Sequence, residues 1–216
     1  MDIRIGRGVG FAALSLVFIA PFSLLYVPEQ TLRTGDLAGT AELQVVEQAL
    51  VRWGLAGELA VVGIELFLLS LLWLLLRRES PVGGAILLSS RLAMTVLQSA
   101  GVIAGWAALQ SFTQGWLEVG GGLLALKSSG MLVWQGIFAL HCAVLAVVLW
   151  RRADSPRWMA VGMGITALAY LAIGVGPLLA DSPLWTHSAL SGLAMGELPF
   201  YLWLAFRRAP KSPAQV

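Results

Sequence analysis

Residues 54–76 read GLAGELAVVGIELFLLSLLWLLL, and this stretch decides the fold class. A membrane-spanning helix needs roughly 20 mostly apolar residues, and this segment meets that length. Two glutamates, Glu58 and Glu65, interrupt it. Because a charge in hydrocarbon costs about 3 kcal/mol or more unless it is paired or hydrated, both are candidate functional residues.

The composition of the whole chain agrees with this segment. Of 216 residues, 58% are apolar and 12% are charged, and the mean hydropathy is +0.80. Soluble domains carry about a quarter charged residues. The basic residues cluster beside apolar runs, where they act as topology signals, so no nucleic-acid partner is expected. The single cysteine, Cys142, excludes an intrachain disulfide.

Apolar runs predict six spans, at about 8–28, 54–76, 82–108, 130–150, 158–180 and 186–206. We therefore expect an all-α integral membrane protein, a six-helix bundle forming a single transmembrane domain over 1–216. The first span is expected to stay uncleaved, because no A-x-A-type site follows it. The Gly-rich stretch 110–130 is expected to form an external loop or a short interfacial helix.

Basic residues predict the orientation. With six spans, ten Lys and Arg residues fall on the side of the two termini and three on the other, namely Arg33, Arg52 and Lys127. This positive-inside bias places both termini in the cytoplasm of a multi-pass protein of the plasma (inner) membrane.

An amphipathic external helix is expected before span two. After Thr40, a candidate N-cap, apolar residues recur at helical spacing: Leu43, Val46, Ala49, Leu50 and Trp53. This pattern is typical of a helix lying on the membrane, and a lid over the external mouth is the alternative.

Four ionisable residues define a polar layer. At 1.5 Å rise per residue, their distances from the cytoplasmic ends of their spans are all roughly 13–17 Å. They are Glu65, Arg91, His141 and Glu197. The best candidate ion pair is Glu65 with Arg91, on consecutive antiparallel spans, and the planar guanidinium group could also reach Glu197.

A second row lies toward the external side. Glu58 precedes Glu65 by seven residues, and Gln98 follows Arg91 by seven, so each pair shares a helix face. Thr166 and Tyr170 on span five could add hydroxyl groups near the layer.

The charges allow a structural or a functional interpretation. If they neutralise one another, the layer fixes helix register. If His141 is neutral, one negative charge is left, and it must bind a proton or a cation. His141 with Glu65 and Glu197 could form a metal-ligand set, but no metal-binding motif supports it, so no metal or cofactor is expected. No nucleophile motif is recognisable either, and no catalytic residue is assigned.

Several short pieces occur in a characteristic order along the chain: Arg7-Gly8, Val27-Pro28, Leu50-Val51-Arg52-Trp53-Gly54 with Glu58, Arg91, Ala139-Leu140-His141-Cys142, Pro156 and Gly196-Glu197-Leu198 with Leu202-Trp203-Leu204. In this order and spacing the chain, from Arg7 to about Phe206, resembles the bacterial membrane proteins grouped as domain-of-unknown-function 4386. The resemblance implies a six-span bacterial membrane protein and carries no established activity.

Three functions stay open. The first is a non-catalytic membrane or accessory protein, with the lipid bilayer and a membrane-protein partner or a second copy as partners. The second is a small proton- or cation-coupled carrier. The third is an intramembrane enzyme on a lipid-like substrate.

Overall fold

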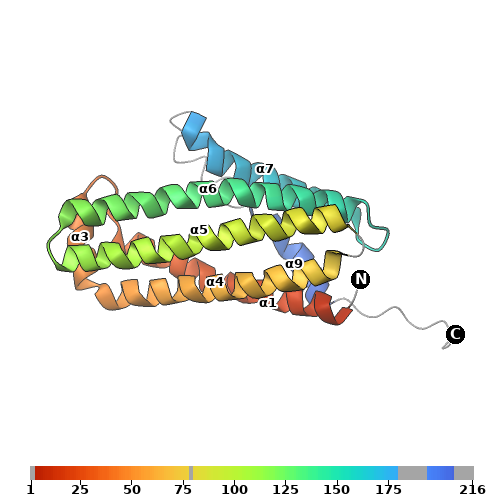
Figure 1. Ribbon diagram of the computed structural model, residues 1–216, viewed down its shortest axis with the longest axis horizontal. Coiled ribbons are helices and arrows are strands. Elements are labelled where there is room, and N and C mark those ends of the chain that lie inside the picture. The colour runs from red at the N-terminus through yellow and green to blue at the C-terminus, as the bar shows by residue number, and fades with distance from the viewer. Residues whose placement is uncertain (1–2, 78–79, 180–193, 207–216) are drawn as a thin grey trace.

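The computed structural model describes residues 3–77, 80–179 and 194–206. Every regular element among them is helical (Figure 1). The elements are α1 (Ile3–Pro21), a π-helical turn η1 (Phe22–Tyr26), α2 (Val27–Thr31), α3 (Leu37–Val46), α4 (Gln48–Leu76), α5 (Pro81–Thr113), α6 (Leu117–Trp150), α7 (Arg157–Leu179), a 3-10 turn η2 (Ala194–Glu197) and α9 (Leu198–Phe206).

Five segments of the described chain are long and apolar enough to cross a membrane: Ile3–Thr31, Gln48–Leu76, Pro81–Thr113, Leu117–Trp150 and Arg157–Gly176. The prediction of an all-α, multi-pass protein is thus confirmed. Of the predicted span 186–206, residues 186–193 lie outside the described residues. The remainder forms η2 and α9.

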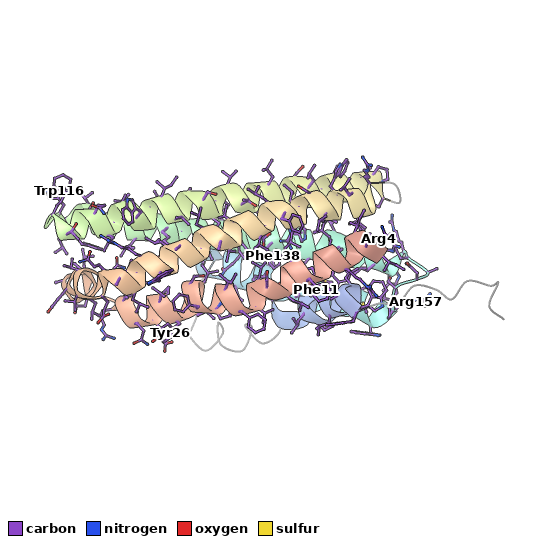
Figure 2. All side chains as sticks on the ribbon, turned by 90° about the horizontal axis from the view of Figure 1, so that it is seen from below. Arg4, Phe11, Tyr26, Trp116, Phe138 and Arg157 are labelled. Carbon is purple, nitrogen blue, oxygen red and sulfur yellow. The ribbon has the colours of Figure 1, made fainter. Side chains whose placement is uncertain are left out.

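Consecutive helices pack side by side and surround a common interior. α1 packs on α4, α4 on α5, α5 on α6 and α6 on α7, while η2 contacts α7 and α9 returns to α1. Figure 2 shows Arg4 and Arg157 at one end of the bundle, Trp116 at the other, and Phe138 between the two ends. We call these the Arg4 end and the Trp116 end.

The prediction of an external loop or a short interfacial helix at 110–130 is wrong. α5 and α6 continue through this stretch and are joined by a tight turn at Gln114, Gly115 and Trp116. Gly115 has φ 77°, a left-handed conformation that glycine adopts without strain. The stretch 117–130 contains no proline, and glycine is common in membrane helices, so its glycines do not end α6. With 33 and 34 residues, these helices are each about 50 Å long.

The helix predicted before span two exists, but its predicted bounds are wrong. α3 begins after Asp36, whose carboxylate accepts a hydrogen bond from the Gly39 amide at 2.8 Å. Thr40 lies inside the helix, where its hydroxyl accepts from the Arg33 amide at 2.8 Å. The chain then bends at Glu47, so Trp53 belongs to α4. α3 packs on α4, α5 and α6, with Thr40 and Gln44 buried and Val46 exposed.

The apolar core fills the half of the bundle nearer the Arg4 end. Leu68 and Leu72 of α4, Leu87 and Met94 of α5, and partners on four other helices form one buried cluster. In the other half the buried cluster is small and consists of Val51, Leu55 and Leu109. On the α1 side of that half, Pro21 is followed by the wider π-helical turn η1. The interior is therefore closed at one end and hollow toward the other.

Candidate functional site

Arg91 is the centre of the polar layer. Its guanidinium group is 2% exposed and donates in three directions. Nη1 pairs with Oε2 of Glu65 on α4. Nη2 donates to the hydroxyl of Tyr201 on α9 at 2.9 Å, and Nε donates to Nε2 of His141 on α6 at 3.4 Å. One cation on α5 therefore ties together three other helices.

The contacts of His141 fit the neutral form of its ring. Nε2 accepts from Arg91, so it carries no proton. Nδ1 lies 3.1 Å from Oγ of Ser90, and that hydroxyl donates to the Leu87 carbonyl at 3.1 Å. The arrangement is satisfied when Nδ1 carries the ring proton and donates it to Ser90. A second proton on the ring would point at the guanidinium group.

Glu197 completes the layer from the junction of η2 and α9. It interacts electrostatically with Arg91 and is hydrogen-bonded to Tyr201 four residues later. Tyr201 thus accepts from Arg91 and donates to Glu197. Since His141 is neutral and Glu65 already balances Arg91, the carboxylate of Glu197 has no cation of its own in the layer.

A second ion pair lies nearer the Trp116 end. Nζ of Lys127 is 2.6 Å from Oε1 of Glu58. The sequence analysis placed Lys127 in an external loop or a short interfacial helix, and this expectation is wrong because Lys127 lies within the long helix α6. Its side chain crosses α5 beside Gly101 and Gly105, where an added Cβ would lie 3.7 Å from Cγ and 3.2 Å from Nζ of Lys127, respectively. The two glycines therefore leave room for the Lys127 side chain to reach the interior.

The polar layer around Arg91 and the ion pair of Glu58 with Lys127 face one cavity of about 600 Å³. Its floor holds Glu65, Arg91, Glu197 and Tyr201, and Glu58, Gln98 and Lys127 line it closer to the Trp116 end. Most of its wall is apolar and comes from α1, η1, α4 and α6, as with Leu16, Leu24, Val61, Leu124 and Met131. Pockets of 300–1,000 Å³ with apolar walls and a few convergent polar groups are typical ligand sites.

Three glutamines in the cavity wall have unsatisfied side-chain oxygens. The Oε1 atoms of Gln44, Gln98 and Gln135 are buried and have no hydrogen-bond partner. They come from α3, α5 and α6, and all three residues line the cavity. A buried acceptor without a partner costs about 1–3 kcal/mol.

The residues predicted from the sequence fall into two groups. The cavity is lined by Glu58, Glu65, Arg91, Gln98, Tyr170 and Glu197. His141 and Thr166 are fully buried beside it and do not line it. Within the described residues, no cluster of three or more His, Cys, Asp or Glu side chains could hold a metal ion.

Sequence reasoning missed Lys127, Tyr201 and Gln135. Lys127 is a lone cation in a stretch with no helix-breaking proline, and the absence of proline is the signal that could have indicated a continuous helix there. Tyr201 follows Glu197 by one helical turn, a spacing that puts both on one face.

These features define a multi-pass α-helical membrane protein with an internal cavity that has a charged floor. A family model described as "Domain of unknown function (DUF4386)" matches residues 8–207, and the chain belongs to this family. Comparisons with curated proteins and with solved structures found no match.

Proposed function

We propose that this chain is a non-catalytic membrane protein that holds an amphipathic small molecule in its cavity. The observation that carries the proposal is the combination of a mostly apolar wall with a charged floor in one space of about 600 Å³. An amphipathic molecule matches this division, because its apolar part can pack against the apolar wall while its polar part reaches Arg91, Tyr201 and Glu197. Of the expected partners, this function requires only the lipid bilayer.

Blocking the cavity tests this function. Ala20 is a half-buried wall residue, so Ala20→Trp places an indole in the space, whereas Ala125→Trp places one on the exposed surface of α6. Three probes with twelve-carbon chains would be used: dodecylammonium, dodecanoate and monododecanoylglycerol. Native mass spectrometry should detect a one-to-one adduct with at least one probe in the unmodified protein and in Ala125→Trp. The binding function is wrong if no probe forms an adduct with the unmodified protein, or if Ala20→Trp still forms every adduct that the unmodified protein forms.

A carrier is the second candidate, favoured by the unbalanced carboxylate of Glu197 and by two rows of charged groups along one cavity. In liposomes, Glu65→Gln or Glu197→Gln would abolish proton-linked flux while the protein stays folded. Unchanged flux would remove this candidate. An enzyme is less favoured, because Ser90 and His141, the nearest approach to a hydrolytic pair in the described chain, are both buried outside the cavity.

We further propose that the Arg4 end faces the cytoplasm of a bacterial inner membrane. Among the described residues, Arg4 and Arg157 lie at this end (Figure 2). Arg7 is near the start of α1, Arg77 follows α4, and Arg151 and Arg152 follow α6, whereas Arg33 and Arg52 flank α3. Basic residues mark the cytoplasmic side. A fluorescent protein fused at the C-terminus should fluoresce, and alkaline phosphatase inserted at Gly35 should be active. The reverse result would show that the protein has the opposite orientation in the membrane.

A further inference from the structure

The charges of the cavity do not balance. Its lining holds three carboxylates, on Glu58, Glu65 and Glu197, and two cations, on Arg91 and Lys127. Lys127 pairs with Glu58, and Arg91 pairs with Glu65. The floor therefore keeps one carboxyl group, on Glu197, that either a proton or a positively charged group of a ligand would neutralise.

Hydrogen-bond acceptors are also in excess. The unpartnered oxygens of Gln44 and Gln98 belong to residues that are 4% and 3% exposed. Both residues line the same cavity as Glu197, and so does Gln135. The two cations of the lining make their hydrogen bonds to other groups: Arg91 donates to three partners, and Lys127 donates to Glu58.

Aromatic rings stand near the same floor. The rings of Phe138 and Tyr170 lie 4.7 Å apart, and Trp134 lies 5.1 Å from Phe138. All three line the cavity. Aromatic faces attract cations. The Arg91 guanidinium already lies over the Phe138 ring, 5.9 Å from its centre, so Trp134 and Tyr170 are the rings of this cluster that remain for a positively charged ligand.

We propose that the cavity binds the protonated amine of an amphipathic molecule, with the ammonium group at Glu197 and the apolar part along the walls formed by α1, η1 and α6. This assignment rests on the proposed binding function. An ammonium group supplies both the missing positive charge and N–H donors. A carboxylate or phosphate head would instead meet Glu197 with no cation left unpaired in the described lining. The amine can belong to a free single-chain amine or to an aminolipid headgroup.

The test compares head groups on one chain length. Native mass spectrometry would measure binding of dodecylammonium, dodecanoate and monododecanoylglycerol to the unmodified protein, to Glu197→Gln and to Glu42→Gln. Glu42 is exposed on α3 and outside the cavity, so its substitution removes the same charge at another place. We expect dodecylammonium to bind most tightly and Glu197→Gln to weaken it roughly tenfold or more, as loss of a charge-assisted hydrogen bond does. Glu42→Gln should leave binding unchanged.

Each outcome bears on the assignment. If the three probes bind equally, or if Glu197→Gln leaves dodecylammonium binding unchanged, the ammonium site is wrong while the binding function stands. If no probe binds, the binding function itself fails. In nanodiscs, retention of phosphatidylethanolamine over phosphatidylcholine that is lost in Glu197→Gln identifies an aminolipid source, and retention of dodecylammonium without such a lipid preference identifies a single-chain amine.

Discussion

The hydroxyl oxygen of Tyr201 lies 2.9 Å from Nη2 of Arg91, and this hydrogen bond joins α9 to α5 at the floor of the cavity. Both side chains are buried. Because the same hydroxyl is hydrogen-bonded to Glu197, one phenol couples the central cation to the unbalanced carboxylate.

Tyr201→Phe should lower the free energy of unfolding by about 1–3 kcal/mol, because a buried N–H of Arg91 loses its acceptor. Thermal unfolding in a mild detergent would measure the change. Tyr26→Phe is the control, since the Tyr26 side chain is half exposed on η1 and its loss of a hydroxyl should have little effect. Equal melting temperatures for Tyr201→Phe and the unmodified protein would contradict the importance of this bond.

Arg91→Gln should destabilise the protein by about 3–5 kcal/mol, because it leaves Glu65 buried without its cation. The double variant Glu65→Gln with Arg91→Gln should be more stable than Arg91→Gln alone, since no unpaired charge remains between these two positions. Unfolding of the four members of this cycle in detergent would give the coupling energy. Strict additivity would show that the two side chains do not depend on each other.

Gly105→Val should displace Lys127 from Glu58. An added Cβ at Gly105 lies 2.9 Å from Cδ2 of Leu55 and 3.2 Å from Nζ of Lys127, so the lysine must move. Labelling with an amine-reactive ester should then increase at Lys127, with Lys211, the other lysine of the chain, as the internal reference. Gly122→Val is the matched control, because nothing lies within 4 Å of its added Cβ. Unchanged labelling of Gly105→Val would show that the lysine reaches Glu58 by another path.

Gly10→Ala should separate α1 from α9. A Cβ at this position would lie 2.4 Å from the Ala205 backbone nitrogen and 2.7 Å from the Tyr201 carbonyl oxygen, and backbone atoms cannot rotate away. We expect a loss of about 1–3 kcal/mol in stability, the usual cost of overpacking. Gly63→Ala meets nothing within 4 Å and should be neutral or slightly stabilising. A melting temperature for Gly10→Ala at or above that of Gly63→Ala would refute the close contact.

The layer could be located from the sequence because helical rise converts residue number into depth. Glu65 and Arg91 are each about ten residues from the same end of their helices, and this count alone places them at one level. The count of residues could not show which side chains contact one another, since contacts depend on the rotation of each helix about its axis and on which helices lie next to each other. The hydrogen bonds of Tyr201 and His141 with Arg91 become known only when the packing of the side chains is known.

The helix ends near Trp116 were mispredicted for a different reason. Glycine counts as a helix breaker in water, and Gly120, Gly121 and Gly122 therefore suggested a loop. In this chain an added Cβ at Gly120 would lie 2.3 Å from Cε1 of Phe112, so that glycine permits α6 to approach α5 closely. The same misjudgement hid Lys127, because a lysine assigned to a loop is not considered as a buried partner.

The lengths of α5 and α6 have a practical consequence. A hydrocarbon layer is about 30 Å thick, and helices of about 50 Å extend past it even when moderately tilted. The α5–α6 hairpin is therefore long enough for its turn at Gln114–Trp116 to reach beyond the hydrocarbon layer. An antibody fragment raised against that tip would add mass and shape to a small particle for electron microscopy while leaving the interior untouched.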